Sequence, residues 1–231
     1  MATVLITGAN RGLGLEFCKE YARDGWTVIA CCREPQSATA LTALAAEYTP
    51  LTIYALDVSD FTQIDRLAAQ LDGVSIDVLI NNAGVYGDTS EHGFGQLVYA
   101  DWTKTLLINV QAPVKMAEAF LPHLLRGDKK VLASISSLMG SITDNSSGGS
   151  IVYRSSKAAL NAAMKSVALD IKAQGVGILL LHPGWVKTDM GGSNAPIEAP
   201  ESVAGMRQVI AAFSPAQSGG FFKYDGTPLP W

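Results

Sequence analysis

Apolar runs of strand length alternate with helical stripes along the whole of this 231-residue chain. Residues 3–7 and 26–32 are apolar runs with β-branched side chains, and a helical stripe that ends at Asp24-Gly25 lies between them. The alternation continues toward the last residues without a break in composition. It predicts one α/β domain over residues 1–231, built on a doubly wound, mostly parallel sheet.

The same pattern gives the position of each element. We expect strands at 3–7, 26–32, 51–56, 76–80, 131–135, 176–181 and 220–224, and helices at 14–22, 38–48, 60–71, 101–125, 153–173 and 200–213. Either Ser59 or Asp60 is expected to cap the helix at 60–71. Ligands of such sheets bind beyond the carboxyl ends of the strands. Polar landmarks follow six of these ends, namely 8–14, Arg33, Asp57, 82–84, Ser137 and Pro183-Gly184.

Composition and charge exclude several classes of partner. A net charge of −4 argues against binding to nucleic acid or to an anionic membrane. No apolar run approaches the ~20 residues of a membrane span, and residues 1–8 lack the charged leader of a signal peptide. The cysteines and histidines show neither a disulfide framework nor metal-ligand spacing; they are Cys18, Cys31, Cys32, His92, His123 and His182. We therefore expect a cytoplasmic protein without a metal site.

The first turn of the chain carries three glycines. Gly8, Gly12 and Gly14 form the pattern T-G-x-x-x-G-x-G between the first strand and the first helix. Glycines there permit a tight turn and a close approach of the backbone to a phosphate, and the helix N-terminus offers free N–H groups. A glycine turn alone is often only a turn, but between a strand and a helix it favours dinucleotide binding.

Tyr153 and Lys157 are four residues apart, which on a helix places both side chains on one face. A neighbouring ammonium favours the phenolate, so we expect Lys157 to lower the pKa of Tyr153 from ~10 toward neutrality. Such a phenol is suited to donate and accept a proton at physiological pH. Taken alone, the pair also occurs by chance on many solvated helices, so its meaning depends on the surrounding motifs.

Together these motifs resemble, in order and over essentially the whole chain, those of the short-chain dehydrogenase/reductase family. The matches are Thr7-Gly8-x-x-x-Gly12-x-Gly14, Asp57-Val58, Asn81-Asn82-Ala83-Gly84, Asn109, Ser137, Tyr153-x-x-x-Lys157 and Pro183-Gly184. Residues 182–192 and 224–231 resemble the subgroup of sniffer-type carbonyl reductases and bacterial C-factor-like proteins. The resemblance implies a Rossmann-type fold with helices on both faces of the sheet.

The resemblance also implies roles for individual residues. Tyr153 is expected to protonate the carbonyl, Lys157 to lower its pKa and bind the nicotinamide ribose, and Ser137 to hold the substrate oxygen. Asn109 is expected to link Lys157 to a water chain that resupplies the proton. Cofactor contacts are expected at Gly8, Asn10, Arg11, Gly12, Leu13, Gly14, Arg33, Asp57, Val58, Asn82, Ala83, Gly84, Tyr153, Lys157, Pro183, Gly184, Val186 and Thr188. Asp57 would accept from the adenine amino group, unless it is only a helix cap.

Ser137 lies 16 residues before Tyr153, farther than is common in the family. We expect the additional glycine and serine residues to loop out beside the substrate. If they do not, Ser136 becomes a rival for the role of Ser137.

The end of the second strand indicates the choice of cofactor. A carboxylate there binds the ribose 2′-OH of NAD, whereas an arginine accommodates the 2′-phosphate of NADP. The family's acidic position aligns with Cys32, Arg33 follows it, and Arg11 projects from the glycine turn. Two cations near one phosphate favour NADP, whereas Glu34 is the contrary evidence for NAD.

The function implied is NADPH-dependent reduction of an aldehyde or ketone. The alternative is an NAD(P)-binding signalling or sensor protein of C-factor type, in which turnover is incidental. The helix at 153–173 has little polar circumference, so we expect a second copy to cover part of it. The long helix at 101–125 is its expected neighbour, and the prediction is a two-fold symmetric homo-oligomer, a dimer or a tetramer.

Overall fold

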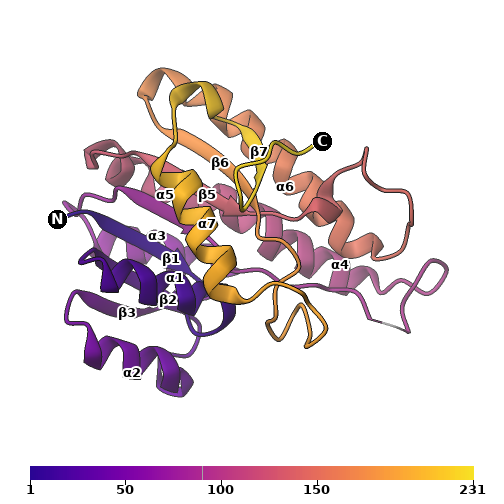
Figure 1. Cartoon of the computed structure of the whole chain (residues 1–231), viewed down its shortest axis with the longest axis horizontal. Helices are drawn as coiled ribbons and strands as arrows, with labels where there is room; N and C mark the ends of the chain where they lie inside the picture. Colours follow the sequence, from indigo (N-terminus) through magenta and orange to yellow (C-terminus); the bar gives the residue numbers. More distant parts are fainter. Residues whose placement is uncertain (90) are drawn as a thin grey trace.

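Parallel strands form the central sheet of the computed structural model, which describes residues 1–89 and 91–231 (Figure 1). The strands are β1 (Thr3–Thr7), β2 (Thr27–Cys32), β3 (Leu51–Ala55), β4 (Val78–Asn81), β5 (Val131–Ile135), β6 (Gly177–His182) and β7 (Gly220–Lys223). Within the described residues their order is β3-β2-β1-β4-β5-β6-β7, and each pairs in parallel with its neighbours. The predicted doubly wound parallel sheet is therefore confirmed.

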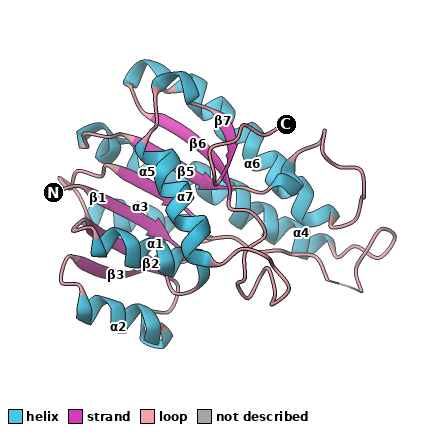
Figure 2. Cartoon of the chain, viewed as in Figure 1, coloured by secondary structure: helices cyan, strands magenta, loops and turns pink. Residues whose placement is uncertain are grey.

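Helices cover both faces of this sheet (Figure 2). On one face lie α1 (Gly12–Arg23), α2 (Thr39–Glu47) and α7 (Ala199–Ala211). On the other lie α3 (Phe61–Gln70), α5 (Ala112–Arg126) and α6 (Ile151–Asp170), while α4 (Tyr99–Leu106) continues α5 beyond the sheet. Asp60, one of the two expected caps, accepts from the N–H groups of Thr62 and Gln63 at the start of α3.

Alternate residues of each strand enter different cores, because successive side chains of a strand point to opposite faces. In β1, Val4 and Ile6 pack in the core under α1, α2 and α7. Leu5 between them packs in the core under α3, α5 and α6. All three are fully buried. This burial on both faces explains why the strands are almost continuously apolar in sequence.

The order of the strands reverses between β1 and β4. The chain proceeds outward from β1 to β3 and then returns to place β4 on the other side of β1. In sheets of this kind, the crevice beyond the carboxyl ends of the two strands at such a reversal is where ligands bind. The glycine turn after β1 and residues 82–84 after β4 both lie at this point.

The long helix expected at 101–125 begins earlier, at Tyr99, and is interrupted by a π-helical turn at Leu107–Gln111. The N–H of Ala112 donates to the carbonyl of Leu107, five residues earlier. Over five residues, apolar spacing does not distinguish a π turn from an α turn, so the sequence did not show it. Asn109 lies within the turn, consistent with the frequent occurrence of such turns at functional sites.

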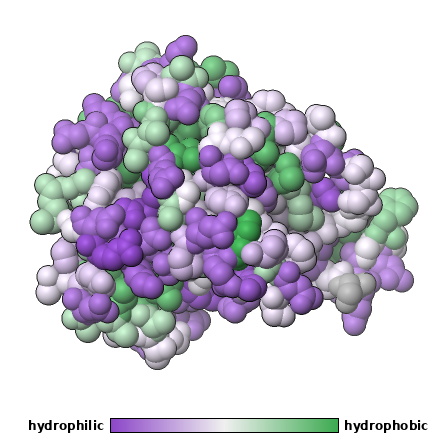
Figure 3. All heavy atoms as spheres, viewed as in Figure 1, coloured by the Kyte–Doolittle hydropathy of each residue, from purple (hydrophilic) through white to green (hydrophobic). Residues whose placement is uncertain are grey.

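In the described part of the chain, none of the helices combines the length and the apolar character needed to cross a membrane. Hydrophilic and hydrophobic side chains are interspersed on the face shown in Figure 3.

Candidate active site

A cleft of about 1210 Å³ runs across the carboxyl ends of the strands. Its walls include most of the residues expected at the site: Gly8, Asn10, Arg11, Gly12, Leu13, Arg33, Asp57, Val58, Asn82, Ala83, Gly84, Ser137, Tyr153, Lys157, Pro183, Gly184, Val186 and Thr188. Gly14 and Asn109 are not among the residues that line it. The polar landmarks at the strand ends therefore belong to one continuous site.

The glycine turn is shaped by close approaches of the backbone. Gly8 has φ +66°, and a Cβ there would lie 2.9 Å from the Cα of Ala83. A Cβ at Gly14 would lie 2.1 Å from the carbonyl oxygen of Gly8, so Gly14 serves the packing of α1 on the turn and not the cleft wall. Arg11, the residue before α1, makes no side-chain hydrogen bond to the first turn of the helix. The N–H groups there are thus not capped by Arg11 and suit an anion.

Hydrogen bonds connect residues 82–84 to the glycine turn. The hydroxyl of Thr7 accepts from the N–H groups of Asn82 (3.0 Å) and Ala83 (3.1 Å). The side-chain amide of Asn82 donates to the carbonyls of Thr7 (2.9 Å) and Gly8 (3.1 Å). The two loops that flank the crevice therefore form one unit.

At the end of β2, Arg33 is exposed and lines the cleft, whereas Glu34 does not line it. The Glu34 carboxylate accepts from the hydroxyl of Ser37 at 3.3 Å. Arg11 lines the cleft as well and forms an exposed ion pair with Asp189 at 2.6 Å. The two arginines expected to bind a 2′-phosphate therefore border the cleft. The carboxylate of Glu34, which would favour NAD, instead accepts a hydrogen bond from Ser37 in its own turn.

Asp57 lies in a turn rather than at a helix cap. Its Oδ1 accepts from the N–H (2.9 Å) and the hydroxyl (2.6 Å) of Ser59. Asp60, and not Asp57, caps α3. The helix-cap alternative for Asp57 is therefore wrong, and its place in the cleft wall is consistent with a contact to a base.

Tyr153 and Lys157 lie on α6 at the cleft, both nearly buried, with Nζ of Lys157 5.7 Å from the centroid of the Tyr153 ring. Nζ donates to the carbonyl of Ile135 at 2.8 Å. Burial raises the pKa of Tyr153 to about 12, and the hydroxyl of Ser137 only partly offsets this. Burial also lowers the pKa of Lys157 to about 8. The expected decrease in the pKa of Tyr153 is therefore wrong for the protein alone. Burial disfavours the charged form of each side chain, the phenolate of Tyr153 and the ammonium of Lys157.

Ser137 and Ser136 both follow β5 and line the cleft, but their hydroxyls have different partners. The hydroxyl of Ser136 donates to Oδ1 of Asn161 at 2.6 Å and is fully buried. The hydroxyl of Ser137 acts on the phenol of Tyr153 as a hydrogen-bond partner that lowers its pKa. A Cβ at Gly140 would lie 2.8 Å from the Cβ of Lys157, so the turn after Ser137 packs tightly on α6. The geometry therefore favours Ser137 over its rival.

The additional residues before Tyr153 form the exposed loop expected from the sequence. Residues 142–149 are exposed and project beside the N-terminal end of α6 (Figure 1). Asp144 from this loop lines the cleft.

Asn109 is buried behind the cleft. Its side-chain amide donates to the carbonyl of Val85 (2.8 Å) and to the hydroxyl of Ser156 (2.9 Å), and its Oδ1 accepts from the N–H of Val85 (2.9 Å). Because these three bonds use the side-chain amide of Asn109, a water chain to Lys157 would have to start from the main chain of the π turn.

Two residues of the cleft wall were not among the site residues predicted from the sequence. Tyr86 packs against Tyr153 with the rings tilted and 4.7 Å between their centroids. His182 lines the cleft, and its buried Nδ1 makes no hydrogen bond to any described residue. Burial, aided by Lys223, lowers the pKa of His182 to about 4, so the ring is neutral at physiological pH. Its position directly before Pro183-Gly184 at a strand end was the available signal.

Known proteins resemble this chain in both sequence and architecture. The family model described as short chain dehydrogenase matches residues 2–198. C-signal of Myxococcus xanthus is 47% identical over 156 residues, 68% of this chain and 93% of that protein. Carbonyl reductase Sniffer of D. melanogaster superposes with a TM-score of 0.92 at 37% identity, covering all of both chains. An NADPH-bound carbonyl reductase from chicken fatty liver gives a TM-score of 0.92 at 34% identity, covering 100% of this chain and 99% of that one. The chain belongs to the short-chain dehydrogenase family.

Proposed function

We propose that the protein reduces an aldehyde or a ketone to an alcohol with NADPH. The observation that carries this proposal is the grouping of Ser137, Tyr153 and Lys157, all at least 92% buried, at one cleft. Buried hydroxyl and ammonium groups of this kind are costly to desolvate, and such groups concentrate at catalytic sites. The carbonyl reductases that share the fold, one of them NADPH-bound, support the same class of reaction.

The cleft has the groups that NADPH requires. The glycine turn and the N-terminus of α1 would hold the pyrophosphate, since the N–H groups are oriented there and the turn has no Cβ atoms at Gly8 and Gly12. Arg33 and Arg11 would hold the 2′-phosphate, and Asp57 and Val58 the adenine. Lys157 would bind the nicotinamide ribose. When bound, NADPH supplies the hydride, and the protein supplies position and electrostatics.

The residues of the chain would divide the remaining work. Ser137 would donate to the carbonyl oxygen of the substrate and stabilise its developing charge. Tyr153 would give its phenolic proton to the same oxygen as the alcohol forms. Lys157, protonated below its pKa of about 8, would stabilise the phenolate that remains. Asn109 would act through the main chain of the π turn, by holding water that returns a proton to Lys157.

The central test is Tyr153→Phe, which keeps the ring and removes the proton. Turnover of NADPH with a panel of aldehydes and ketones is expected to fall by about 10²-fold or more. The dissociation constant for NADPH is expected to change little. Tyr48→Phe removes an equivalent hydroxyl far from the cleft and serves as the control. A Tyr153→Phe enzyme with near-normal kcat would refute the assignment.

A second candidate function is a nucleotide-binding signal protein, which the similarity to C-signal favours. Such a protein needs NADP(H) binding but not turnover. The same carbonyl panel distinguishes the two, because binding of NADPH without turnover of any member would favour the signalling role.

The assembly and the location are also proposals. α6 and α4 lie side by side, with Nε1 of Trp102 donating to the hydroxyl of Ser155 at 2.9 Å. The outer face of α6 exposes Ala162, Ser166 and Leu169, and Leu169 is 62% exposed. This uncharged stripe of small and apolar side chains supports a two-fold homo-oligomer. The buried free thiols support a reducing location such as the cytoplasm.

A further inference from the structure

A carboxylate from a distant loop holds the first turn of α6. Oδ2 of Asp88 accepts from the N–H of Tyr153 at 2.7 Å, and Oδ1 accepts from the N–H of Val152 at 3.2 Å. Ser150, the residue at the helix start, has φ +45° and makes no side-chain cap. The helix that carries the phenol is therefore capped from 64 residues away, and one of the two capped N–H groups is that of Tyr153 itself.

The residues before Asp88 are fixed to the same surroundings. The Tyr86 ring packs against the Tyr153 ring with 4.7 Å between their centroids, and its hydroxyl is 2.7 Å from the hydroxyl of Ser150. Gly87 has φ +79°, and a Cβ there would lie 2.3 Å from Oγ1 of Thr105. Any other residue at position 87 would push the loop away from α4 and α6. Aromatic contact, hydrogen bonds and the lack of space thus define one path for this segment.

The segment begins at the cofactor side of the cleft. Both main-chain groups of Val85 bond to the side chain of Asn109. Earlier in the segment, Asn82 and Ala83 bond to Thr7 in the unit that includes the glycine turn. The segment is therefore attached at several points between the floor of the nucleotide crevice and the backbone of Tyr153.

We propose that Asp88 is a positioning residue for Tyr153, and that residues 82–88 form a strap which fixes the phenol relative to the cofactor turn. This proposal rests on the proposed function. The negative carboxylate complements the partial positive charge of the helix N-terminus. It restrains the main chain of Tyr153 directly, so a shift of the strap moves the phenol. A displacement of about 1 Å at a reacting group can reduce a rate about 10²-fold.

The test compares Asp88→Ala with Asp60→Ala. Asp60 caps α3 with the same pair of hydrogen bonds, so its removal is a matched loss of one helix cap, and the residue does not line the cleft. Assayed well below both melting temperatures, Asp88→Ala is expected to lower kcat by about 10- to 100-fold with the dissociation constant for NADPH within about threefold. Asp60→Ala is expected to keep the normal kcat. Asp88→Asn retains an acceptor oxygen and is expected to recover part of the loss.

A double variant separates positioning from a general loss of structure. If Asp88 acts through the phenol, adding Asp88→Ala to Tyr153→Phe should lower the residual turnover by less than twofold, because coupled residues are not additive. Normal kcat in Asp88→Ala and in Asp88→Asn, or full additivity in the double variant, would overturn the positioning role. If Tyr153→Phe itself keeps full turnover, the proposed reaction fails instead, so the two failures are distinguishable.

Discussion

We expect single side chains at the end of β2 to decide which dinucleotide the cleft accepts. Cys32 is uncharged where a carboxylate would favour NAD, and Arg33 borders the cleft directly after it. A guanidinium offers a planar fork of donors to a phosphate, which suits it better than an ammonium. The Glu34 carboxylate accepts from the hydroxyl of Ser37, so we expect it not to compete for the ribose.

Arg33→Ala is therefore expected to weaken NADPH about 10- to 100-fold, because a charge-assisted contact contributes roughly 1.5–3 kcal/mol. NADH lacks the phosphate and should be little affected. Adding Cys32→Asp should produce a preference for NADH, with some NADPH use retained through Arg11. The measurement is kcat/KM for both cofactors in each variant. A wild type that prefers NADH would show that Glu34 governs this strand end.

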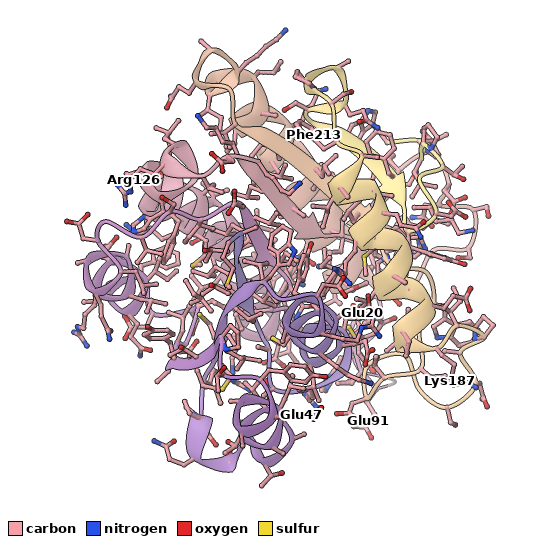
Figure 4. All side chains as sticks on the ribbon, turned by 60° about the vertical axis from the view of Figure 1, so that its left-hand side comes forward. Glu20, Glu47, Glu91, Arg126, Lys187 and Phe213 are labelled. Carbon is pink, nitrogen blue, oxygen red and sulfur yellow. The ribbon has the colours of Figure 1, made fainter. Side chains whose placement is uncertain are left out.

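A partly buried ion cluster joins two helices on one face of the sheet. Nη1 of Arg207 on α7 is 2.9 Å from Glu20 of α1, whose side chain is 6% exposed, and Nη2 is 2.5 Å from Asp24. The guanidinium carbon lies 4.3 Å from the centroid of the Tyr21 ring. Figure 4 shows Glu20 where α1 and α7 meet. The cluster fixes α1, and with it the glycine turn, to the C-terminal part of the chain.

Removing one partner from such a cluster leaves a buried charge. Arg207→Ala is expected to lower the free energy of unfolding by about 3–5 kcal/mol, measured by denaturant titration. Arg207→Met combined with Glu20→Met removes both charges and should recover most of the loss, because a well-packed apolar pair replaces a buried ion pair at little cost. A double variant as unstable as Arg207→Ala would show that packing, and not the unpaired carboxylate, determines the effect.

At the scale of the whole molecule, the order of elements was predictable because apolar runs of strand length alternate with helical stripes, and the inner strands are buried almost throughout. Most residues of the cleft were also predictable, because ligands of such sheets bind beyond the carboxyl ends of the strands. The contacts of Asp88 and Arg207 were not predictable, since they join residues 64 or more positions apart in sequence. The predicted pKa of Tyr153 was wrong because the helical spacing shows that Lys157 is near, but not that both side chains are buried away from water.

The proposed assembly predicts a mass in solution above the 24.4 kDa of one chain. Light scattering at micromolar concentration should give a multiple of that mass. Ala162→Arg places a charge on the exposed face of α6 and should reduce it to the monomer. Ala211→Arg, at an exposed alanine of α7, is the matched control and should leave the oligomer intact. A wild-type mass of 24.4 kDa would refute the assembly.

The stability of the whole protein is expected to fall as the pH decreases from 6.5 to about 4. Burial lowers the pKa of His182 to about 4 and lowers that of His123, so the unfolded chain binds more protons in this window. For His182 the loss is up to ~1.4 kcal/mol per pH unit. His182, which faces Lys223, Asp144 and Asp225, can be replaced by Gln. Thermal unfolding of His182→Gln should then depend less on pH; an unchanged slope would exclude His182 as a contributor.

The π turn at Leu107–Gln111 accommodates one residue more than an α turn and leaves the two halves of the helix in phase. The same extra residue in a regular α helix would rotate everything before it by about 100°. Deleting Asn109 would therefore close the wide turn and keep α4 in register with α5, so Trp102 should stay beside Ser155. The two bonds between Asn109 and Val85 would be lost. The wide turn thus lets the helix present an amide to the loop after β4 without displacing the helical segments on either side of it.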